Sequence, residues 1–517
     1  MTHPDRSSHT HRVWHAAFAA ALAIALPACG GNTGETESDS DSDGEPGGIE
    51  ILIDSQGIPH IYADNDEDLM FAAGYQMATD RLFQMDLLRR RALGRGAEVL
   101  GEEKLAEDSL SRIMNFRDWG TLDAQRLQSE RPDDYRLFEA WVEGVNRRIE
   151  EVNAGDAPLP YGFGSSAGEL NYVPELYEIE DTFAIAKMFM FGNSNSLEFE
   201  VLASVFEMIA PDTAEAIELA RPAFETFTLP PEDRPTPDAV PSGEGQKLRK
   251  AAPVKTPPPG LGAGLHRLHD ALSGFDVLGS NNWVVAGQFT ENGRPMICND
   301  PHQPLQSPSL MYAQHLNSAD ADGNLDVIGF SFVGAPGLHL GHTRGVHWAA
   351  TTGFADAMDM WAVSVDDSGT MVTVAGEQRP LTTRSETIRV AGMPDMVLDI
   401  EEVEGHGVLL GDTLLEPLGI NEAFLVGNDK RLLLNWTGFR ATNESAAFLD
   451  FARAQTVDEY EAAVDLMEVG TFNWLSADAN DISYRVNVLI PDRGDPSARK
   501  MPYTIIQDED PATFWTD

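Results

Sequence analysis

The hydrophobic pattern of this chain changes from helical to strand-like part-way along its length. Residues 66–91 predict one long helix, with acids in its first turn and arginines in its last. Its apolar face is formed by Leu69, Ala72, Ala73, Met77, Leu82, Met85 and Leu88. Helical patterns continue to about residue 222. Short apolar runs after Ser280 predict strands instead, so we expect an α+β fold with a helix-rich first part.

The strands expected in the second part begin with residues 283–286 and 295–298, followed by 327–333 and 346–352. Two more strands, at 51–54 and 60–63 around a Gln56-Gly57 turn, precede the long helix. A short helix is expected at 261–272.

Two segments have no hydrophobic period. Residues 29–48 are acidic and rich in Ser and Gly, which predicts a disordered tether because such sequence buries little apolar surface. Residues 226–279 contain a stretch rich in Pro, Gly and charge, which reads as a surface linker. The chain thus divides into a helical region at 49–225 and a sheet-rich region at 280–517.

The N-terminus has the pattern of a secretory signal. Residues 16–27 are apolar but too few to span a bilayer as a helix, and small residues precede Cys29. A cysteine at that position is typical of a bacterial lipoprotein, with residues 1–28 as the signal peptide and Cys29 lipidated. The alternative is an ordinary signal peptide with an incidental cysteine. We therefore expect a periplasmic or cell-surface protein that meets the membrane only through its lipid anchor.

The charge of the chain limits the classes of binding partner, and its cysteine content limits the disulfides, that we expect. The chain has 517 residues, of which 36 are basic and 83 acidic, for a net charge of −47. Nucleic acids and anionic membranes both require basic patches, so neither is expected as a partner. Cys298 has no partner once Cys29 is lipidated, so no structural disulfide is expected.

The candidate chemistry centres on Gly279-Ser280, at the start of an expected strand. A serine in this position suits a nucleophile that is released as a new N-terminus, whereas the alternative is an ordinary loop serine. No Gly-x-Ser-x-Gly elbow surrounds it. Asn292-Gly293 predicts a two-residue hairpin that places residue 305 opposite Ser280 and His302 opposite Trp283. His302 is then expected within about 10 Å of Ser280.

Several motifs in this order resemble those of penicillin-acylase-type N-terminal nucleophile hydrolases. The family includes penicillin, cephalosporin and acyl-homoserine-lactone acylases. The matching segments are Asp54-Ser55-Gln56-Gly57-Ile58-Pro59-His60-Ile61, Gly74-Tyr75, Asp80-Arg81-Leu82-Phe83-Gln84-Met85, Arg89-Arg90 with Gly94 and Glu98, Gly279-Ser280-Asn281-Asn282-Trp283, Asn299-Asp300-Pro301-His302, and Gly341-His342 through Trp348 to Asp359.

The resemblance implies a four-layer αββα core and a precursor that cleaves itself between Gly279 and Ser280. Residues 49–225 would form an α-subunit, residues 226–279 a spacer, and the region from Ser280 onward a β-subunit of an α/β heterodimer. The freed α-amino group, whose ordinary pKa is about 7.7–8.0, suits a general base near neutral pH. Ser280 would thus supply both nucleophile and base, without an organic cofactor.

Two further residues take catalytic roles by resemblance. The backbone N–H of Thr352 would bind the oxyanion of the tetrahedral intermediate. His302 would orient the Ser280 amine or help bind the intermediate. Penicillin G acylases carry Gln at this position, and cephalosporin and homoserine-lactone acylases carry His.

The resemblance also implies a structural calcium ion held by Glu198, Asp356 and Asp359, since carboxylate oxygens suit that ion. A solvated acidic turn is the alternative. Met188, Phe191 and Gln303 are candidates for the acyl pocket, with core packing as the alternative for Met188 and Phe191.

One element of the family pattern is not found before Asp517. The second oxyanion donor of the family is an Asn side chain further along, so we expect the chain to be a fragment whose C-terminal part is missing. The implied function is an amide hydrolase acting on a small N-acylated compound of the β-lactam, acyl-homoserine-lactone or lipopeptide type. The alternative is a non-catalytic surface lipoprotein that uses the acylase fold as a binding scaffold.

Overall fold

A computed structural model describes residues 48–194, 196–209, 257–273, 280–303, 306–353, 355–493, 504–507 and 510–515. All of them fall in one unit, Gly47–Asp517. The expected signal peptide, Cys29, almost all of the tether, most of the spacer and Gly279 lie outside the described residues. None of the described helices is both long enough and apolar enough to cross a membrane.

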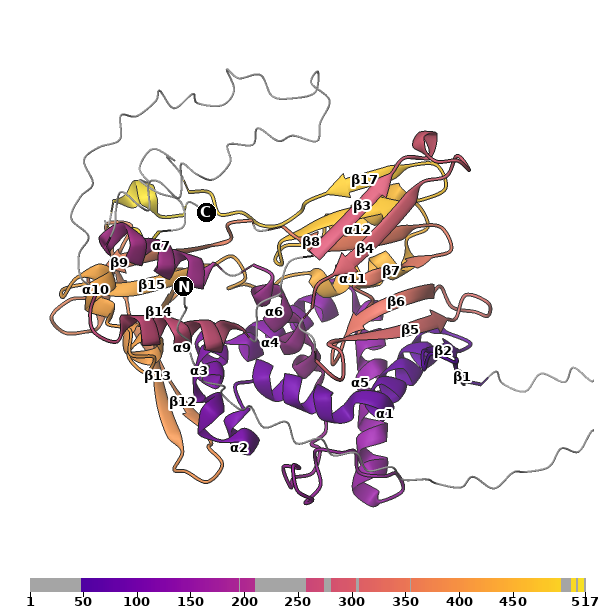
Figure 1. Cartoon of the computed structure of the whole chain (residues 1–517), viewed down its shortest axis with the longest axis horizontal. Helices are drawn as coiled ribbons and strands as arrows, with labels where there is room; N and C mark the ends of the chain where they lie inside the picture. The colour runs from indigo at the N-terminus through magenta and orange to yellow at the C-terminus, as the bar shows by residue number, and fades with distance from the viewer. Residues whose placement is uncertain are drawn as a thin grey trace, which may run out of the picture. The chain divides into compact units, whose positions relative to one another are not determined.

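The first part is helical, as the pattern predicts (Figure 1). The long helix α1 spans Asp66–Ala92, and the Asn65 side chain caps it by accepting the Asp68 N–H at 2.9 Å. The other helices here are α2 (Ala97–Leu100), α3 (Leu105–Met114), α4 (Phe116–Glu130), α5 (Pro132–Ala154), α6 (Ile179–Gly192) and α7 (Leu197–Ile209).

Helices α1 and α5 cross closely because each has a glycine at the crossing. A Cβ on Gly74 would lie 2.0 Å from the Trp141 carbonyl oxygen, and one on Gly144 would lie 1.9 Å from that of Phe71. Any larger residue would push the helices apart. The crossing buries Trp141 and Met77, which are 1% and 0% exposed.

An eight-stranded sheet forms the centre of the second part, in the order β1-β2-β5-β6-β7-β8-β16-β17. Its strands are β1 (Glu50–Ile53), β2 (Pro59–Tyr62), β5 (Met311–Asn317), β6 (Asp326–Phe332), β7 (Leu340–Thr343), β8 (His347–Thr352), β16 (Phe472–Ala477) and β17 (Ile482–Arg485). Strand β2 runs parallel to β5, with His60 opposite His315. The first two strands of the chain therefore complete a sheet built mainly from its second half.

The two faces of this sheet are covered by different elements. Helices α11 (Glu444–Arg453) and α12 (Val457–Val464) pack on one face, where the Trp348 ring lies 6.2 Å from that of Phe451 and 5.8 Å from that of Tyr460. The hairpin of β3 (Ser280–Val285) and β4 (Met296–Pro301) packs on the other, against β8 and β16. Hairpin, sheet and helices thus make three successive layers.

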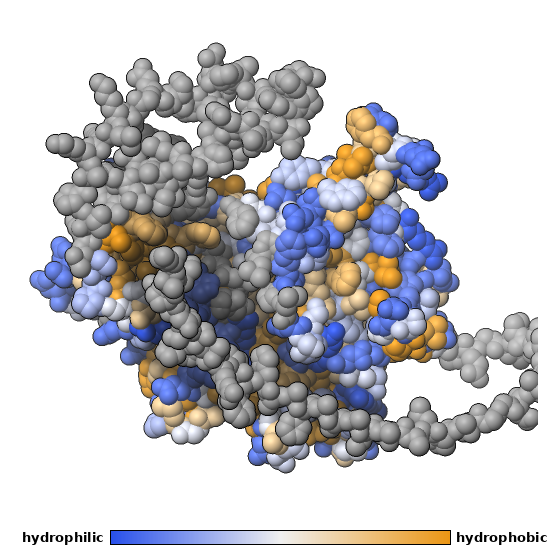
Figure 2. Space-filling view, viewed as in Figure 1, coloured by the Kyte–Doolittle hydropathy of each residue, from blue (hydrophilic) through white to orange (hydrophobic). Residues whose placement is uncertain are grey.

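The fourth layer of the expected core would lie on the outer face of the hairpin. Among the described residues this region exposes apolar side chains: Trp283 is 46% exposed, Met296 51% and Phe289 76%. Figure 2 shows hydrophobic surface near the tip of the hairpin. The four-layer order stays a prediction.

The register of the hairpin corrects the sequence-based expectation. Ser280 pairs with Pro301 and Trp283 with Cys298, not with residues 305 and 302. The connection is not a two-residue turn: it runs from Ala286 to Pro295 and includes a 3-10 turn at Gly287–Phe289. A Cβ on Gly287 would lie 2.4 Å from the Gly293 carbonyl oxygen, so the loop folds tightly back on itself. His302 therefore follows directly after the residue opposite Ser280.

A second sheet, in the order β12-β13-β14-β15-β9, has a smaller hydrophobic core of its own. Its strands are β9 (Met358–Val363), β12 (Thr382–Ile388), β13 (Met396–Val403), β14 (Gly407–Leu409) and β15 (Arg431–Trp436), with a separate pair of β10 (Met371–Val374) and β11 (Glu377–Pro380). The remaining helices are α9 (Leu261–Ser273), which the sequence predicts, and α10 (Glu422–Val426).

Candidate active site

Ser280 is the first residue of β3 and is held from two sides. The Thr351 hydroxyl of β8 donates to the Ser280 carbonyl oxygen at 2.7 Å. The backbone N–H of His302 donates to Ser280 Oγ at 3.3 Å. The Ser280 hydroxyl thus lies where β3, β4 and β8 meet. Gly279 lies outside the described residues, so the peptide bond expected to be cleaved is not described.

The imidazole of His302 has its own partners. Its Nε2 lies 3.0 Å from Asp300 Oδ2 and 3.3 Å from Asn281 Nδ2. Because a carboxylate only accepts, a bond to Asp300 requires the proton on Nε2, and Nε2 then cannot also accept from the Asn281 amide. The ring is 48% exposed, and the backbone of His302 is what contacts Ser280. The expected proximity to Ser280 holds, but through the main chain.

The backbone N–H of Thr352 is not paired with β16. Thr352 pairs with Phe472, and the Gly353 N–H donates to the Thr471 carbonyl oxygen at 2.6 Å, so the pair is of the non-hydrogen-bonded kind. The Thr352 N–H therefore points away from β16. It shares this direction with the Ala350 N–H, which donates to Asn299 Oδ1 of β4 at 3.0 Å. Thr352 and Ser280 both line one small cavity, and the role of Thr352 as oxyanion donor stays a prediction.

A small cavity of about 20 Å³ adjoins Ser280. Its lining comprises Asn193, Ser280, Pro301, Gln303, Met311, Phe332, His339, Leu340, Ala350, Thr351, Thr352 and Phe472. None of these side chains carries a fixed charge. A space of this size holds about one water molecule.

The lining contains polar atoms that the described residues leave unsatisfied. Asn193 Oδ1, Gln303 Oε1, Thr352 Oγ1 and His339 Nδ1 are buried and have no hydrogen-bond partner within the described part of the chain. Buried polar atoms are seldom left in this condition, because each costs about 1–3 kcal/mol. A water molecule or the polar groups of a ligand in this cavity could satisfy these atoms.

A second cavity of about 20 Å³ shares Phe332 and His339 with the first. Helix α6 contributes Thr182, Ala186, Phe189 and Met190 to it, and Asn193 just beyond the helix lines the first cavity. Met188 and Phe191 line neither of these two cavities. Phe191 packs instead on Phe116 and Trp436, with both ring centroids at 5.4 Å.

Met188 and Phe191, the pocket residues expected on α6, line neither of these two cavities, and their place in the acyl pocket stays a prediction. Side chains at Thr182, Ala186, Phe189 and Asn193 follow the three- and four-residue spacing of one helix face. Met188 and Phe191 fall on another face, in the main core. The sequence does not distinguish the two faces, because α6 is apolar almost all round.

His339 is a residue of the site that sequence reasoning missed. It precedes β7 in an apolar run and is 5% exposed. Its ring is surrounded by those of Phe332, Phe448, Phe472 and Trp474, with centroids 4.9, 5.4, 5.0 and 5.4 Å away. Burial lowers the pKa of His339 to about 3. The only signal in the sequence is a histidine among apolar residues.

The acids expected to hold calcium do not converge in the described arrangement. Glu198 interacts with His269, at 3.2 Å. Asp356 and Asp359 both pair with Arg493 at 2.8 Å. Over the described ranges, no group of three or more His, Cys, Asp or Glu side chains is placed to hold a metal ion. The arrangement as it stands does not fit the expected ion, because a guanidinium already bridges two of the three carboxylates.

A different acid lies near this pair. Burial, and after it the neighbouring Asp359 carboxylate, raise the pKa of Glu200 well above its ordinary value. Glu200 Oε1 accepts a hydrogen bond from the Ser196 hydroxyl at 2.7 Å. Glu200 Oε2 is buried and has no hydrogen-bond partner among the described residues.

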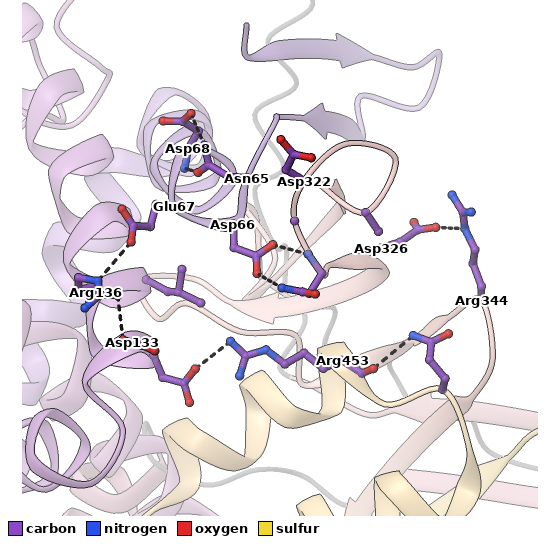
Figure 3. Close-up of a pocket in the computed structure, with 16 residues that line it drawn as sticks. Asn65, Asp66, Glu67, Asp68, Asp133, Arg136, Asp322, Asp326, Arg344 and Arg453 are labelled. Atoms are coloured by element: carbon purple, nitrogen blue, oxygen red, sulfur yellow. Dashed lines mark hydrogen bonds and ion pairs between the residues drawn. The ribbon is translucent and has the colours of Figure 1, made fainter. Parts of the chain in front are cut away.

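A wide acidic depression of about 1210 Å³ lies elsewhere, at the N-terminus of α1 (Figure 3). Asp66 Oδ1 accepts the Asn324 N–H at 2.8 Å, and Arg453 pairs with Asp134 at 2.8 Å. None of the residues predicted for the active site lines it.

Comparison with known proteins identifies the family. The sequence model of penicillin amidase matches residues 48–516. The chain belongs to the penicillin amidase family. This membership accounts for the order of motifs around Ser280 and agrees with the mixed helix and sheet architecture.

Family relatives include enzymes named for two kinds of substrate. Penicillin acylase 2 proenzyme of Pseudomonas sp. (strain SE83) is 31% identical over 372 residues, covering 71% of this chain and 44% of the relative. Acyl-homoserine lactone acylase QuiP of Pseudomonas fluorescens (strain Pf0-1) is 28% identical, covering 86% of this chain and 50% of the relative. Penicillin G acylase of Escherichia coli is 24% identical, covering 86% of this chain and 54% of the relative.

The chain thus spans about half the length of the curated relatives it matches. Among solved structures, thermostable penicillin G acylase of Alcaligenes faecalis matches at 20% identity and a TM-score of 0.38, over 45% of this chain and 39% of that one.

Proposed function

We propose that this chain belongs to an acylase that hydrolyses the amide bond of a small N-acylated compound through Ser280 as an N-terminal nucleophile. The observation that carries the proposal is Ser280 itself. In a member of the penicillin amidase family, this serine begins a strand, is held by Thr351 and His302, and opens on a cavity with four unsatisfied polar atoms.

Processing comes first in this proposal. Ser280 Oγ attacks the Gly279 carbonyl carbon, the peptide bond breaks, and the resulting ester is hydrolysed by water. The products are an α-subunit with its spacer and a β-subunit that begins at Ser280. One relative bears the name proenzyme, which supports such a step.

Catalysis then uses the new amino group. It takes the proton of Ser280 Oγ as the hydroxyl attacks the amide carbonyl, and the amine product leaves with a proton. Water then attacks the acyl-enzyme and releases the acid. The N–H of Thr352, a residue that lines the cavity beside Ser280, would stabilise the oxyanion. His302 would act through its backbone N–H on Ser280 Oγ.

N-terminal sequencing of the purified full-length protein tests the proposal. We expect a fragment that begins with Ser280, and hydrolysis within a panel of phenylacetyl, glutaryl and long-chain acyl amides. Ser280→Ala should remain uncleaved and inactive, whereas Ser368→Ala, in an exposed turn, should behave as wild type. An intact wild-type chain without hydrolysis would favour the alternative, a non-catalytic lipoprotein that binds ligands on the acylase fold.

Two accompanying proposals concern features outside catalysis. Cys29 would carry a lipid that anchors the protein to a bacterial membrane, which mass spectrometry of the mature N-terminus would detect. Calcium would bind at Asp356 and Asp359 with Glu198, or with the buried Glu200 in its place. In either case Arg493 would have to move away from the two aspartates.

A further inference from the structure

Two histidines on neighbouring strands, His60 and His315, carry an inference about a second site. His60 lies on β2 opposite His315 on β5, and their Nδ1 atoms are 3.1 Å apart. Neither residue lines the two small cavities of the candidate active site. We propose that these two imidazoles together bind a divalent transition-metal ion of the zinc type.

The carboxylates around the pair favour the same protonation in both rings. His315 Nε2 lies 3.1 Å from Asp326 Oδ1, and His60 Nε2 lies 3.6 Å from Asp54 Oδ2. A carboxylate only accepts, so the proton of each neutral ring belongs on Nε2 and the lone pair on Nδ1. Two rings in this state direct their lone pairs at each other across 3.1 Å. A cation between the two Nδ1 atoms removes this repulsion.

The distances and the outer partners fit a metal ion as that cation. Two nitrogens held at about 2.0–2.1 Å by one tetrahedral zinc ion lie about 3.3 Å apart, close to the 3.1 Å between these Nδ1 atoms. Histidines that bind a metal usually donate their other ring N–H to a carboxylate, which fixes the ring and raises its basicity. Asp326 and Asp54 occupy this outer position. Water molecules would complete the four ligands.

The surroundings of the pair also suit a cation that arrives from solvent. The side chains of His60 and His315 are 28% and 16% exposed. Asp54 and Asp326 place negative charge beside the pair, and Arg344 offsets part of it through its ion pair with Asp326 (Figure 3). Imidazole nitrogen selects zinc, copper or nickel over calcium and magnesium, which prefer oxygen ligands.

The ion would join two parts of the chain that are distant in sequence. His60 precedes α1, in the region expected to form an α-subunit, and His315 follows Ser280. The pairing of β2 with β5 begins at these two histidines. A metal ion bound there would fasten the two strands whether or not the chain is cleaved before Ser280. The inference is therefore independent of the proposed function.

Titration of the whole protein with zinc chloride, followed by calorimetry, tests the proposal. We expect His60→Phe and His315→Phe each to lose one zinc site of the wild type. The double variant should lose that same site and no more, because chelation requires both rings. Asp326→Asn leaves both rings in place and should weaken binding at this site about tenfold through the lost outer carboxylate.

His342→Phe is the matched control, because His342 lies on β7 of the same sheet and its ring stacks on that of His347 at 4.4 Å. It should retain the zinc site that His60→Phe loses. A wild-type protein that binds no zinc would overturn the proposal, as would zinc binding that is unchanged in His60→Phe, His315→Phe and Asp326→Asn. Absence of amide hydrolysis with this zinc site intact would refute the proposed function alone.

Discussion

The hydroxyl of Thr351 donates a 2.7 Å hydrogen bond to the carbonyl oxygen of Ser280. This bond ties the first residue of β3 to the strand whose next residue, Thr352, lines the cavity beside Ser280. The proposed nucleophile and the proposed oxyanion donor are therefore positioned by adjacent residues of β8. Their relative placement depends on Thr351.

Removal of the Thr351 hydroxyl should reduce turnover more than binding. In Thr351→Val the Ser280 carbonyl loses its donor while the side-chain shape is kept, so we expect kcat to fall about tenfold. KM should change little. Steady-state kinetics on the best acyl amide measure this, and Thr351→Ser, which keeps the hydroxyl, should stay close to wild type. A Val variant with normal kcat would show that the bond does not position Ser280.

Acid should destabilise the wild-type protein more than a His339 variant. The folded-state pKa of His339, about 3, lies below the ordinary value of 6.5, so the unfolded chain binds a proton that the folded one does not. The stability due to neutral His339 is present above pH 6.5 and is lost as the pH falls toward 3. At pH 5 the loss is about 2 kcal/mol.

Urea unfolding at pH 7.5 and pH 5 measures this effect. His339→Phe should lose about 2 kcal/mol less than wild type between the two values, since it has no imidazole to protonate. His342→Phe serves as the comparison, and we expect it to lose as much unfolding free energy between the two pH values as wild type. An identical loss in all three proteins would contradict the buried, neutral state of His339.

Removal of the cation from a buried ion pair in the helical part should destabilise the folded chain strongly. Lys187 of α6 is 0% exposed and lies 3.0 Å from Asp123 of α4, while its Nζ also donates to the Thr442 hydroxyl and the Arg440 carbonyl oxygen. Burial already raises the pKa of Asp123 to about 7. Lys187→Met leaves this carboxylate without its cation.

We expect Lys187→Met to lower the free energy of unfolding by about 3 kcal/mol near neutral pH. Chemical denaturation measures it. Lys104→Met is the control, because Lys104 is 37% exposed and pairs with Glu107 on the surface, where such pairs contribute less than about 1 kcal/mol. Similar losses in the two variants would show that the buried pair has no special weight.

Variants of Glu198 and Glu200 can show which of these two acids binds the proposed calcium ion. If the proposed ion binds, its addition should raise the melting temperature and its removal by a chelator should reverse the change. Glu198→Gln and Glu200→Gln then distinguish the two candidate ligands, since only the true ligand's variant should lose the response. A melting temperature that does not respond to calcium in wild type would exclude the ion.

The local pattern of the sequence predicted much of the fold. The long helix α1, the strand pair β1 and β2, helix α9 and the strands β3 and β4 follow from periodicity and turn residues. The proximity of His302 to Ser280 also followed, since any hairpin at this point brings the two together. The register did not, because the compact loop around Gly287 and Gly293 depends on contacts that a turn dipeptide does not encode.

What the sequence by itself determined is the family, the nucleophile candidate and the succession of helices and strands, because these depend on residues that are near one another in the chain. Tertiary structure decided which face of α6 meets the cavity, that Glu198 turns to His269 while Glu200 lies near Asp359, and that His339 lies beside Ser280. Each of these depends on packing between segments far apart in sequence. The role of a buried polar group depends on the residues packed around it, and these come from distant parts of the sequence.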